Sequence, residues 1–226
     1  MRITMLSAIV LLSFHLKAQV DSLTTFEVGL SFGQSFSTVD FSLSSRPENM
    51  YSSRTGVDLG IGLRYFNLRA AGFAAELNYV GGGWQETTIE LDSITGDTIA
   101  SNLYERDIAY IEAQILTQFA FGRKLIRPIL QAGPYLAIPI RDKEIFPADF
   151  SLPEDDTYFG RSLGNRLNYG LTIGLGLYIA LERIGIQLEG RARFGLVDLV
   201  PNGTNGISTS RRQGIGWRAT AWYSLH

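Results

Sequence analysis

Side chains that commonly carry out acid–base, nucleophilic or metal chemistry are scarce in this chain. The sequence has no cysteine and two histidines, His15 and His226. No thiolate can therefore act as a nucleophile or a metal ligand. A Ser-His-Asp triad or a histidine metal site would have to use one or both of these two histidines. A mechanism that uses carboxylates alone stays open. We expect a protein that is not an enzyme and that holds no metal and no cofactor.

The charged side chains can instead pair with one another. Carboxylates and arginines recur at alternate positions of otherwise apolar segments, as at Glu189, Arg191 and Arg193, so they share one face of a strand. The planar guanidinium group of arginine suits paired carboxylates in a confined space. The predicted charge network consists of Glu27, Asp58, Arg64, Glu76, Glu112, Glu189, Arg191, Arg193 and Arg218.

Such a network has two interpretations. It could be a paired plug that closes the interior of the fold, or the selectivity lining of a narrow pore for small solutes. The width of the interior distinguishes them, because about 16 strands, and not eight, leave an aqueous channel.

The segments that carry these charges have strand periodicity. From Leu167 to Ile179, for example, large apolar residues fall on every second position, with glycine and polar residues between them. The pattern predicts eight strands near residues 26–36, 57–65, 71–79, 109–119, 128–140, 166–179, 184–196 and 214–225.

The predicted connections alternate in length. Short ones lie near residues 66–68, 121–124 and 181–183, and long polar ones span 37–54, 81–107, 141–165 and 200–212. We therefore predict an all-β fold: an up-and-down antiparallel transmembrane β-barrel of eight strands, with short periplasmic turns and long outer loops. One question stays open, because Thr87 to Leu91 and Thr98 to Tyr104 either prolong strands beyond the membrane or form an additional pair.

The charges decide which face meets lipid. An arginine that faces hydrocarbon near the membrane midplane costs about 2 to 4 kcal/mol, so Arg64, Arg191, Arg193 and Arg218 must point inward. Glycines crowd the same face, which fits a narrow interior where side chains fill the space. The bulky apolar residues must then face lipid.

Aromatic residues gather near the strand ends on the apolar face. Barrels of the outer membrane carry aromatic girdles at both membrane surfaces, although aromatic residues are also common in strands of every kind. The predicted girdle consists of Phe26, Phe36, Tyr65, Tyr79, Phe119, Tyr169 and Tyr223.

The first residues predict export. Arg2 precedes an apolar stretch over residues 3–16, and Ala18 offers a small residue for cleavage, so residues 1–18 are interpreted as a signal peptide and 19–226 as one barrel domain. The stretch is shorter than the roughly 20 residues of a spanning helix. The net charge of −2, with scattered basic residues, excludes nucleic acid as an expected partner. Arg211 and Arg212 could contact lipopolysaccharide phosphates at the outer rim or form an ordinary solvated strand end.

Four segments resemble the PorT-like outer-membrane β-barrel proteins of Bacteroidota. They are residues 110–116 (YIEAQIL), 127–135 (RPILQAGPY), 168–176 (NYGLTIGLG) and 189–196 (EGRARFGL). The resemblance implies a barrel in the outer membrane of a Gram-negative bacterium, with outer-membrane lipid, lipopolysaccharide and the outer-membrane assembly machinery as partners. It also implies, as an alternative, an accessory role in type IX protein secretion. The leading hypothesis is a non-enzymatic barrel with a plugged lumen that presents its outer loops to surface or envelope proteins.

Overall fold

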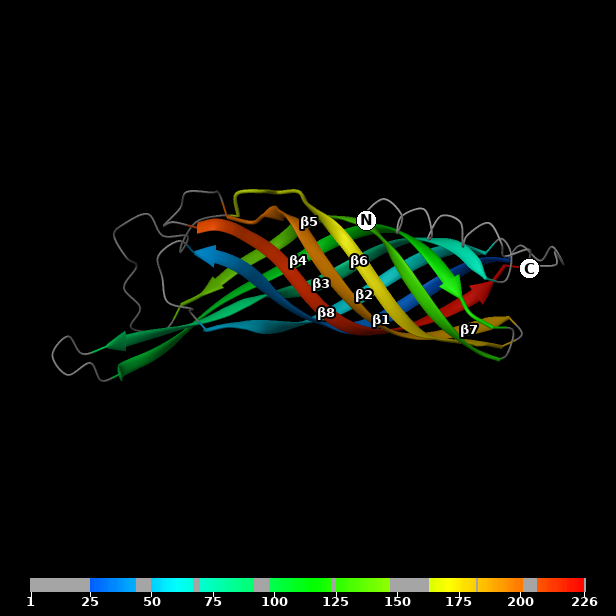
Figure 1. Ribbon diagram of the computed structural model, residues 1–226, viewed down its shortest axis with the longest axis horizontal. Helices are drawn as coiled ribbons and strands as arrows, with labels where there is room; N and C mark the ends of the chain where they lie inside the picture. Colours follow the sequence, from blue (N-terminus) through cyan, green and yellow to red (C-terminus); the bar gives the residue numbers. More distant parts are fainter. Residues whose placement is uncertain are drawn as a thin grey trace, which may run out of the picture.

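The computed structural model describes residues 25–43, 50–66, 70–91, 98–122, 125–146, 163–181, 183–200 and 207–225. These residues form eight strands in a closed barrel (Figure 1). The strands are β1 (Thr25–Leu43), β2 (Met50–Phe66), β3 (Ala71–Leu91), β4 (Thr98–Ala120), β5 (Ile126–Ile145), β6 (Asn168–Ala180), β7 (Ile184–Asp198) and β8 (Ile207–Ser224). Within these ranges, no helix is both long and apolar enough to cross a membrane.

Each strand pairs antiparallel with the next, and β8 pairs with β1 to close the ring. Gly29 on β1, for example, is aligned with Gly62 on β2 and with Trp222 on β8. Closure leaves no strand edge unpaired around the barrel wall. The predicted eight-stranded, up-and-down antiparallel barrel is confirmed.

The outward face of the barrel is apolar and the inward face is polar. On β6, Leu171, Ile173 and Leu175 are 48%, 47% and 66% exposed, whereas Thr172 between them is fully buried. A barrel that dissolves in water would show the reverse pattern, because its apolar residues would fill the core. The exposed apolar band is the surface that a membrane covers.

The strands are longer than the sequence pattern predicts. The predicted loop over 37–54 is wrong, since β1 continues to Leu43 and β2 begins at Met50. The predicted loop over 81–107 is also wrong, since 87–91 and 98–104 prolong β3 and β4, with Thr87 aligned with Leu103. Likewise β5 runs on to Ile145, and β8 begins at Ile207.

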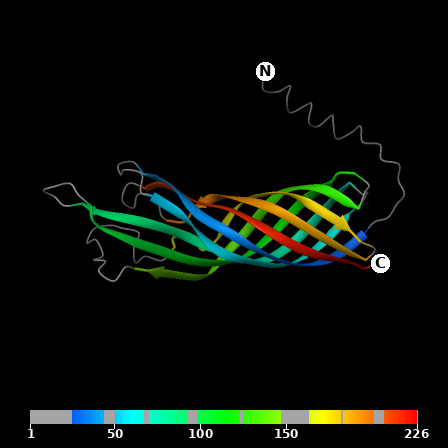
Figure 2. The same cartoon turned by 90° about the horizontal axis from the view of Figure 1, so that it is seen from below.

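The sequence pattern misses the outer parts of the strands because these parts are surrounded by water and not by lipid. Lipid imposes the alternation of apolar and polar residues, but beyond the membrane the outward face meets water and can be polar on both sides. The backbone ladder continues without that signal. We call the end with the long strands the loop end; the β3–β4 hairpin reaches farthest there, and β1 begins and β8 ends at the opposite end, the turn end (Figures 1 and 2).

Two glycines make room for a tryptophan at the turn end. A Cβ added to Gly29 would lie 2.5 Å from the ring of Trp222, and one added to Gly62 would lie 3.0 Å from it. Any side chain at Gly29 would therefore push the indole out of the lumen. This close approach explains glycine inside a strand, where it otherwise weakens the sheet.

Replacing Gly29 by valine tests this packing. We expect Gly29→Val to destabilise the barrel by about 1–3 kcal/mol, because the new side chain overlaps Trp222. The folded fraction can be followed on unboiled gels, where a closed barrel migrates differently from the boiled chain. Gly190→Val is the matched control, because a Cβ there meets no atom closer than 3.9 Å. Equal folding of the two variants would contradict the packing argument.

Candidate functional site

All nine residues of the predicted charge network lie inside the barrel. They are at most 6% exposed, and they come from β1, β2, β3, β4, β7 and β8. A tenth charged residue, Arg212 on β8, joins them and is 2% exposed. The assignment of Arg212 to the outer rim is therefore wrong, whereas Arg211 is exposed. Strand parity could have indicated this, because Arg212 lies six residues before Arg218 on the same strand and so shares its face.

Glu76 is the centre of the network. Arg191 donates two hydrogen bonds to its carboxylate, at 2.6 and 2.8 Å, and Arg218 donates a third at 3.1 Å. Arg191 also forms an ion pair with Glu189. One carboxylate thus joins β3 to β7 and β8, which are distant from it in the sequence. Paired geometry of this kind gives stronger hydrogen bonds than contacts between neutral groups.

A chain of ion pairs crosses the lumen on the loop side of Glu76. Arg193 donates to Asp58 at 2.5 Å and to Glu112 at 2.9 Å. Arg212 donates to the second oxygen of Glu112 at 3.0 Å. The chain links β2, β7, β4 and β8 across the interior.

Arg64 closes the network at the turn end. It donates to Glu27 at 2.6 Å, and its guanidinium carbon lies 5.0, 4.5 and 4.3 Å from the ring centres of Phe66, Tyr178 and Trp222. Contacts between a cation and an aromatic ring strengthen when water is excluded. These rings belong to a buried cluster with Ala120 and Ile129.

A second aromatic cluster lies over the loop side. The Arg212 guanidinium lies 4.2 Å from the ring centre of Tyr110 and 5.8 Å from that of Tyr135. The cluster consists of Val39, Trp84, Tyr104, Ile108, Tyr110, Tyr135, Ala137, Leu199 and Val200. By strand parity, Tyr110 shares the inward face with Glu112 and Tyr135 shares it with Gln131, but parity does not indicate which arginine each ring contacts.

At the loop end, Arg106 also lies close to an aromatic ring. It donates to Asp142 at 2.7 and 2.6 Å, pairs with Glu144 at 2.9 Å and lies 5.5 Å from the ring centre of Trp84. Burial alone would lower the pKa of Arg106, but the hydrogen bonds and charge of Asp142 raise it above the usual value. For the Tyr104 hydroxyl, burial has the opposite effect and raises the pKa. Both groups therefore keep one protonation state around neutral pH.

The lumen between the two aromatic clusters is electrically balanced. Its buried charges are five carboxylates and five arginines: Glu27, Asp58, Glu76, Glu112 and Glu189, with Arg64, Arg191, Arg193, Arg212 and Arg218. Every one of these arginines contacts at least one of the carboxylates. An unpaired charge in such a place would cost several kcal/mol. In the ranges that the structure describes, no group of three or more metal-binding side chains is found.

The predicted girdle residues lie on the outward face, but Phe36 and Tyr79 lie well inside β1 and β3 and not near strand ends, because these strands are longer than predicted. Five of them, Phe26, Tyr65, Phe119, Tyr169 and Tyr223, are exposed, and Phe36 and Tyr79 are partly exposed. Phe26 is aligned with Tyr65 at the turn end. That these rings mark the two membrane surfaces stays a prediction.

Residues 17–200 match a family model described as "Outer membrane protein beta-barrel domain". No curated protein matches the sequence. Among solved structures, the chain is similar to Neisserial surface protein A at 14% identity, covering 88% of this chain and 97% of that one, with a TM-score of 0.45. It is similar to OprG from Pseudomonas aeruginosa at 13% identity, covering 91% and 97%, with a TM-score of 0.49. A third similarity is to the outer membrane enzyme PagL, at 14% identity, 82% and 97% coverage and a TM-score of 0.38.

Removing the charge of Glu76 tests the network. We expect Glu76→Gln to lower the free energy of unfolding by on the order of 3 kcal/mol, because Arg191 and Arg218 lose their shared carboxylate in a buried site. Urea unfolding of the protein folded into lipid vesicles measures the change.

Arg141→Gln is the control for Glu76→Gln. It removes an exposed pair with Asp107, in which the Arg141 side chain is 52% exposed, and should cost less than about 1 kcal/mol. If the two variants lose equal stability, the buried network does not stabilise the barrel as described.

Proposed function

Since the chain belongs to the outer membrane protein β-barrel domain family, we propose that it is a barrel with a closed lumen that acts through its surfaces and not through a pore. Proteins of this family are integral to the outer membrane of Gram-negative bacteria. The proposed role is to present the loop end to cell-surface or envelope partners. A narrow channel for small solutes is the alternative.

The observation that carries this proposal is the set of ion pairs across the lumen. Arg193 spans from Asp58 to Glu112, and aromatic clusters cover the network on both sides. An eight-stranded barrel leaves just enough interior space for side chains. Breaking a buried pair by removing one partner costs about 3–5 kcal/mol, so thermal motion would rarely open a continuous path.

The same pairs support a non-enzymatic role. A general acid or base needs a pKa near the working pH and access to its substrate. Glu76 and Glu112 are each held by two arginines and are buried. Carboxylates in that setting are poorly suited to exchange protons with a substrate.

The long strands at the loop end supply a polar outer surface. Arg54 pairs with Glu105 and, at 3.7 Å, with Asp107, and Arg141 pairs with Asp107 at 3.0 Å. These side chains join β2, β4 and β5 above the apolar band. We propose this surface as the contact region for envelope proteins, and the exposed Arg141, Lys143 and Arg211 as contacts for lipopolysaccharide phosphates.

Conductance measurements test the closed lumen. Purified barrel inserted in planar lipid bilayers should show no steady conductance, because the paired side chains fill the interior. The double variant Arg191→Ser and Arg193→Ser removes the two arginines that join β7 to Glu76, Asp58 and Glu112. It should conduct more than the unchanged protein, provided that unboiled gels show it to be folded. A large, steady conductance of the unchanged protein would overturn the proposal in favour of the channel.

The resemblance to PorT-like proteins supports a second candidate function, an accessory role in type IX protein secretion. The resemblance rests on residues 110–116, 127–135, 168–176 and 189–196, which are barrel strands. If the role is correct, deletion of the gene should retain secreted proteins inside the cell, as measured by comparing culture supernatants. Normal export from the deletion strain would remove this candidate and leave the closed-barrel proposal intact.

Export itself requires a signal. The predicted signal peptide, residues 1–18, lies outside the described residues, and cleavage after Ala18 stays a prediction. As an outer-membrane barrel, the mature chain would also contact the assembly machinery, and we propose no nucleic-acid partner.

A further inference from the structure

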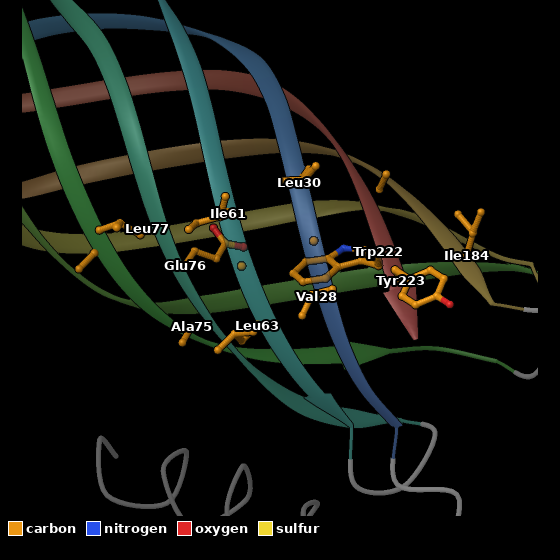
Figure 3. A pocket seen from close by; sticks show the side chains of 14 residues that line it. Val28, Leu30, Ile61, Leu63, Ala75, Glu76, Leu77, Ile184, Trp222 and Tyr223 are labelled. Atoms are coloured by element: carbon orange, nitrogen blue, oxygen red, sulfur yellow. The ribbon is translucent and has the colours of Figure 1, made fainter. Parts of the chain in front are cut away.

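A groove of about 850 Å³ runs over the outward face in the turn-end half of the barrel (Figure 3). We call it the lipid-facing groove. Residues of β1, β2, β3, β4, β7 and β8 line it. The outward side chains are apolar apart from the hydroxyl of Tyr223, and the inward residues Gly29, Gly62, Glu76 and Trp222 also belong to the lining. Its size falls within the range of ligand pockets. The feature is unusual because a barrel wall is expected to be convex around its circumference.

The strand register explains the hollow. One row of aligned outward residues runs Ala221, Leu30, Ile61, Leu77 and Ala113 across β8, β1, β2, β3 and β4. The next row toward the turn end runs Tyr223, Val28, Leu63 and Ala75.

Small and large side chains alternate unevenly in these two rows. Ala75, Ala113, Ala221 and Val28 are short, and the leucines and isoleucines around them stand higher. The short residues form the low points of the floor in two groups, Ala221 with Val28 and Ala75 with Ala113, and longer side chains stand between the two groups. The uneven shape therefore follows from side-chain size and does not need any break in the sheet.

At the turn end, the groove adjoins a region that contains two arginines. Ile184 lines both the groove and a second cavity, of about 360 Å³, at the turn-end mouth of the lumen. Arg127 and Arg183 line that second cavity. Arg183 is exposed and lies beside the end of β8, since its carbonyl oxygen accepts a hydrogen bond from Ser224 N at 2.9 Å. Glu27 in the same cavity is paired with Arg64.

We propose that the groove holds one phospholipid of the periplasmic leaflet, with its acyl chains on the floor of the groove and its phosphate at Arg183. The short turns put this end of the barrel on the periplasmic side. An apolar channel that ends at a cation matches the two parts of a phospholipid. Arginine is well suited to phosphate, because its planar donors bind two oxygens at once.

Hydrocarbon fits this groove better than a peptide segment does. The backbone groups of β1, β2 and β3 along the groove are engaged in the barrel ladder. An extended peptide laid across them would find no partners for its own N–H and C=O groups, which is costly inside a membrane. Acyl chains have no such groups and can adapt to the uneven floor. The experiment must distinguish a bound phospholipid from a second copy of the chain and from a helix of another protein.

Native mass spectrometry of the folded barrel, extracted from membranes in mild detergent, tests the proposal. We expect a population that retains one phospholipid, identified by its mass. Ala75→Phe should lose this adduct, because the ring fills the floor of the groove. Arg183→Gln should reduce it about fivefold, the effect of one basic residue near an anionic lipid surface.

Two control variants match these changes in size and charge. Ala132→Phe adds the same ring to an exposed position on β5, outside the groove, and Arg166→Gln removes an exposed cation near the loop end. Both should retain the adduct, and unboiled gels should show all four variants folded. Adding glycerol phosphate in excess should not displace the lipid, because it lacks the chains.

The proposal would be overturned by any of three results. The unchanged protein could carry no phospholipid, the variants and controls could carry equal amounts, or the retained mass could be a second protein chain. None of these results bears on conductance, so failure here leaves the closed lumen of the proposed function standing.

Discussion

Charge balance in a narrow interior is the constraint on which the rest of this barrel depends. Lipid covers the outside, so the arginines of the wall can point only inward, where they are buried. Each arginine must then find a carboxylate, and Glu76 satisfies two of them at once. Arginine serves this arrangement better than lysine, because one guanidinium group can bind two partners in fixed directions, as Arg193 binds Asp58 and Glu112.

Volume is the second requirement, and the glycines provide it. Several large inward side chains lie against glycines of other strands: Trp222 against Gly29 and Gly62, and Tyr178 against Gly185. At these positions the missing glycine side chain leaves the space that the ring occupies. The aromatic rings then fill the space around Arg64 and Arg212 at the two ends of the network. Packing and electrostatics are therefore one arrangement, because the rings exclude the water that would weaken the ion pairs.

Much of this could be predicted from the sequence, since the membrane imposes a local signal. Alternation identified the eight strands and the inward side of Glu76, Arg191 and Arg218, because parity along a strand is a local property. The partner of each arginine could not be predicted, because it depends on the register of strands as far apart as β3 and β8. Strand ends were missed for a different reason: beyond the lipid, residues such as Thr87 and Leu103 pair through their backbones without an apolar pattern. Arg212 was misplaced with those ends, although its parity matches Arg218.

The interior and the outward surfaces of the barrel differ in how strongly their residues depend on one another. Ion pairs across the lumen join strands on opposite sides, so a change at Glu112 would act on β4, β7 and β8 together. A region with such coupling tolerates little variation, because each substitution there disturbs several ion pairs at once. The outward surfaces are different: the lipid-facing groove carries outward residues such as Ala75 and Leu63 beside the inward Glu76 and Trp222, and the polar pairs at the loop end include the exposed Arg141. Substitutions at the loop end lie away from the buried ion pairs of Glu76, so their effects on stability should add to those of changes in the lumen. Recognition at the surfaces proposed above can therefore vary while the interior stays the same.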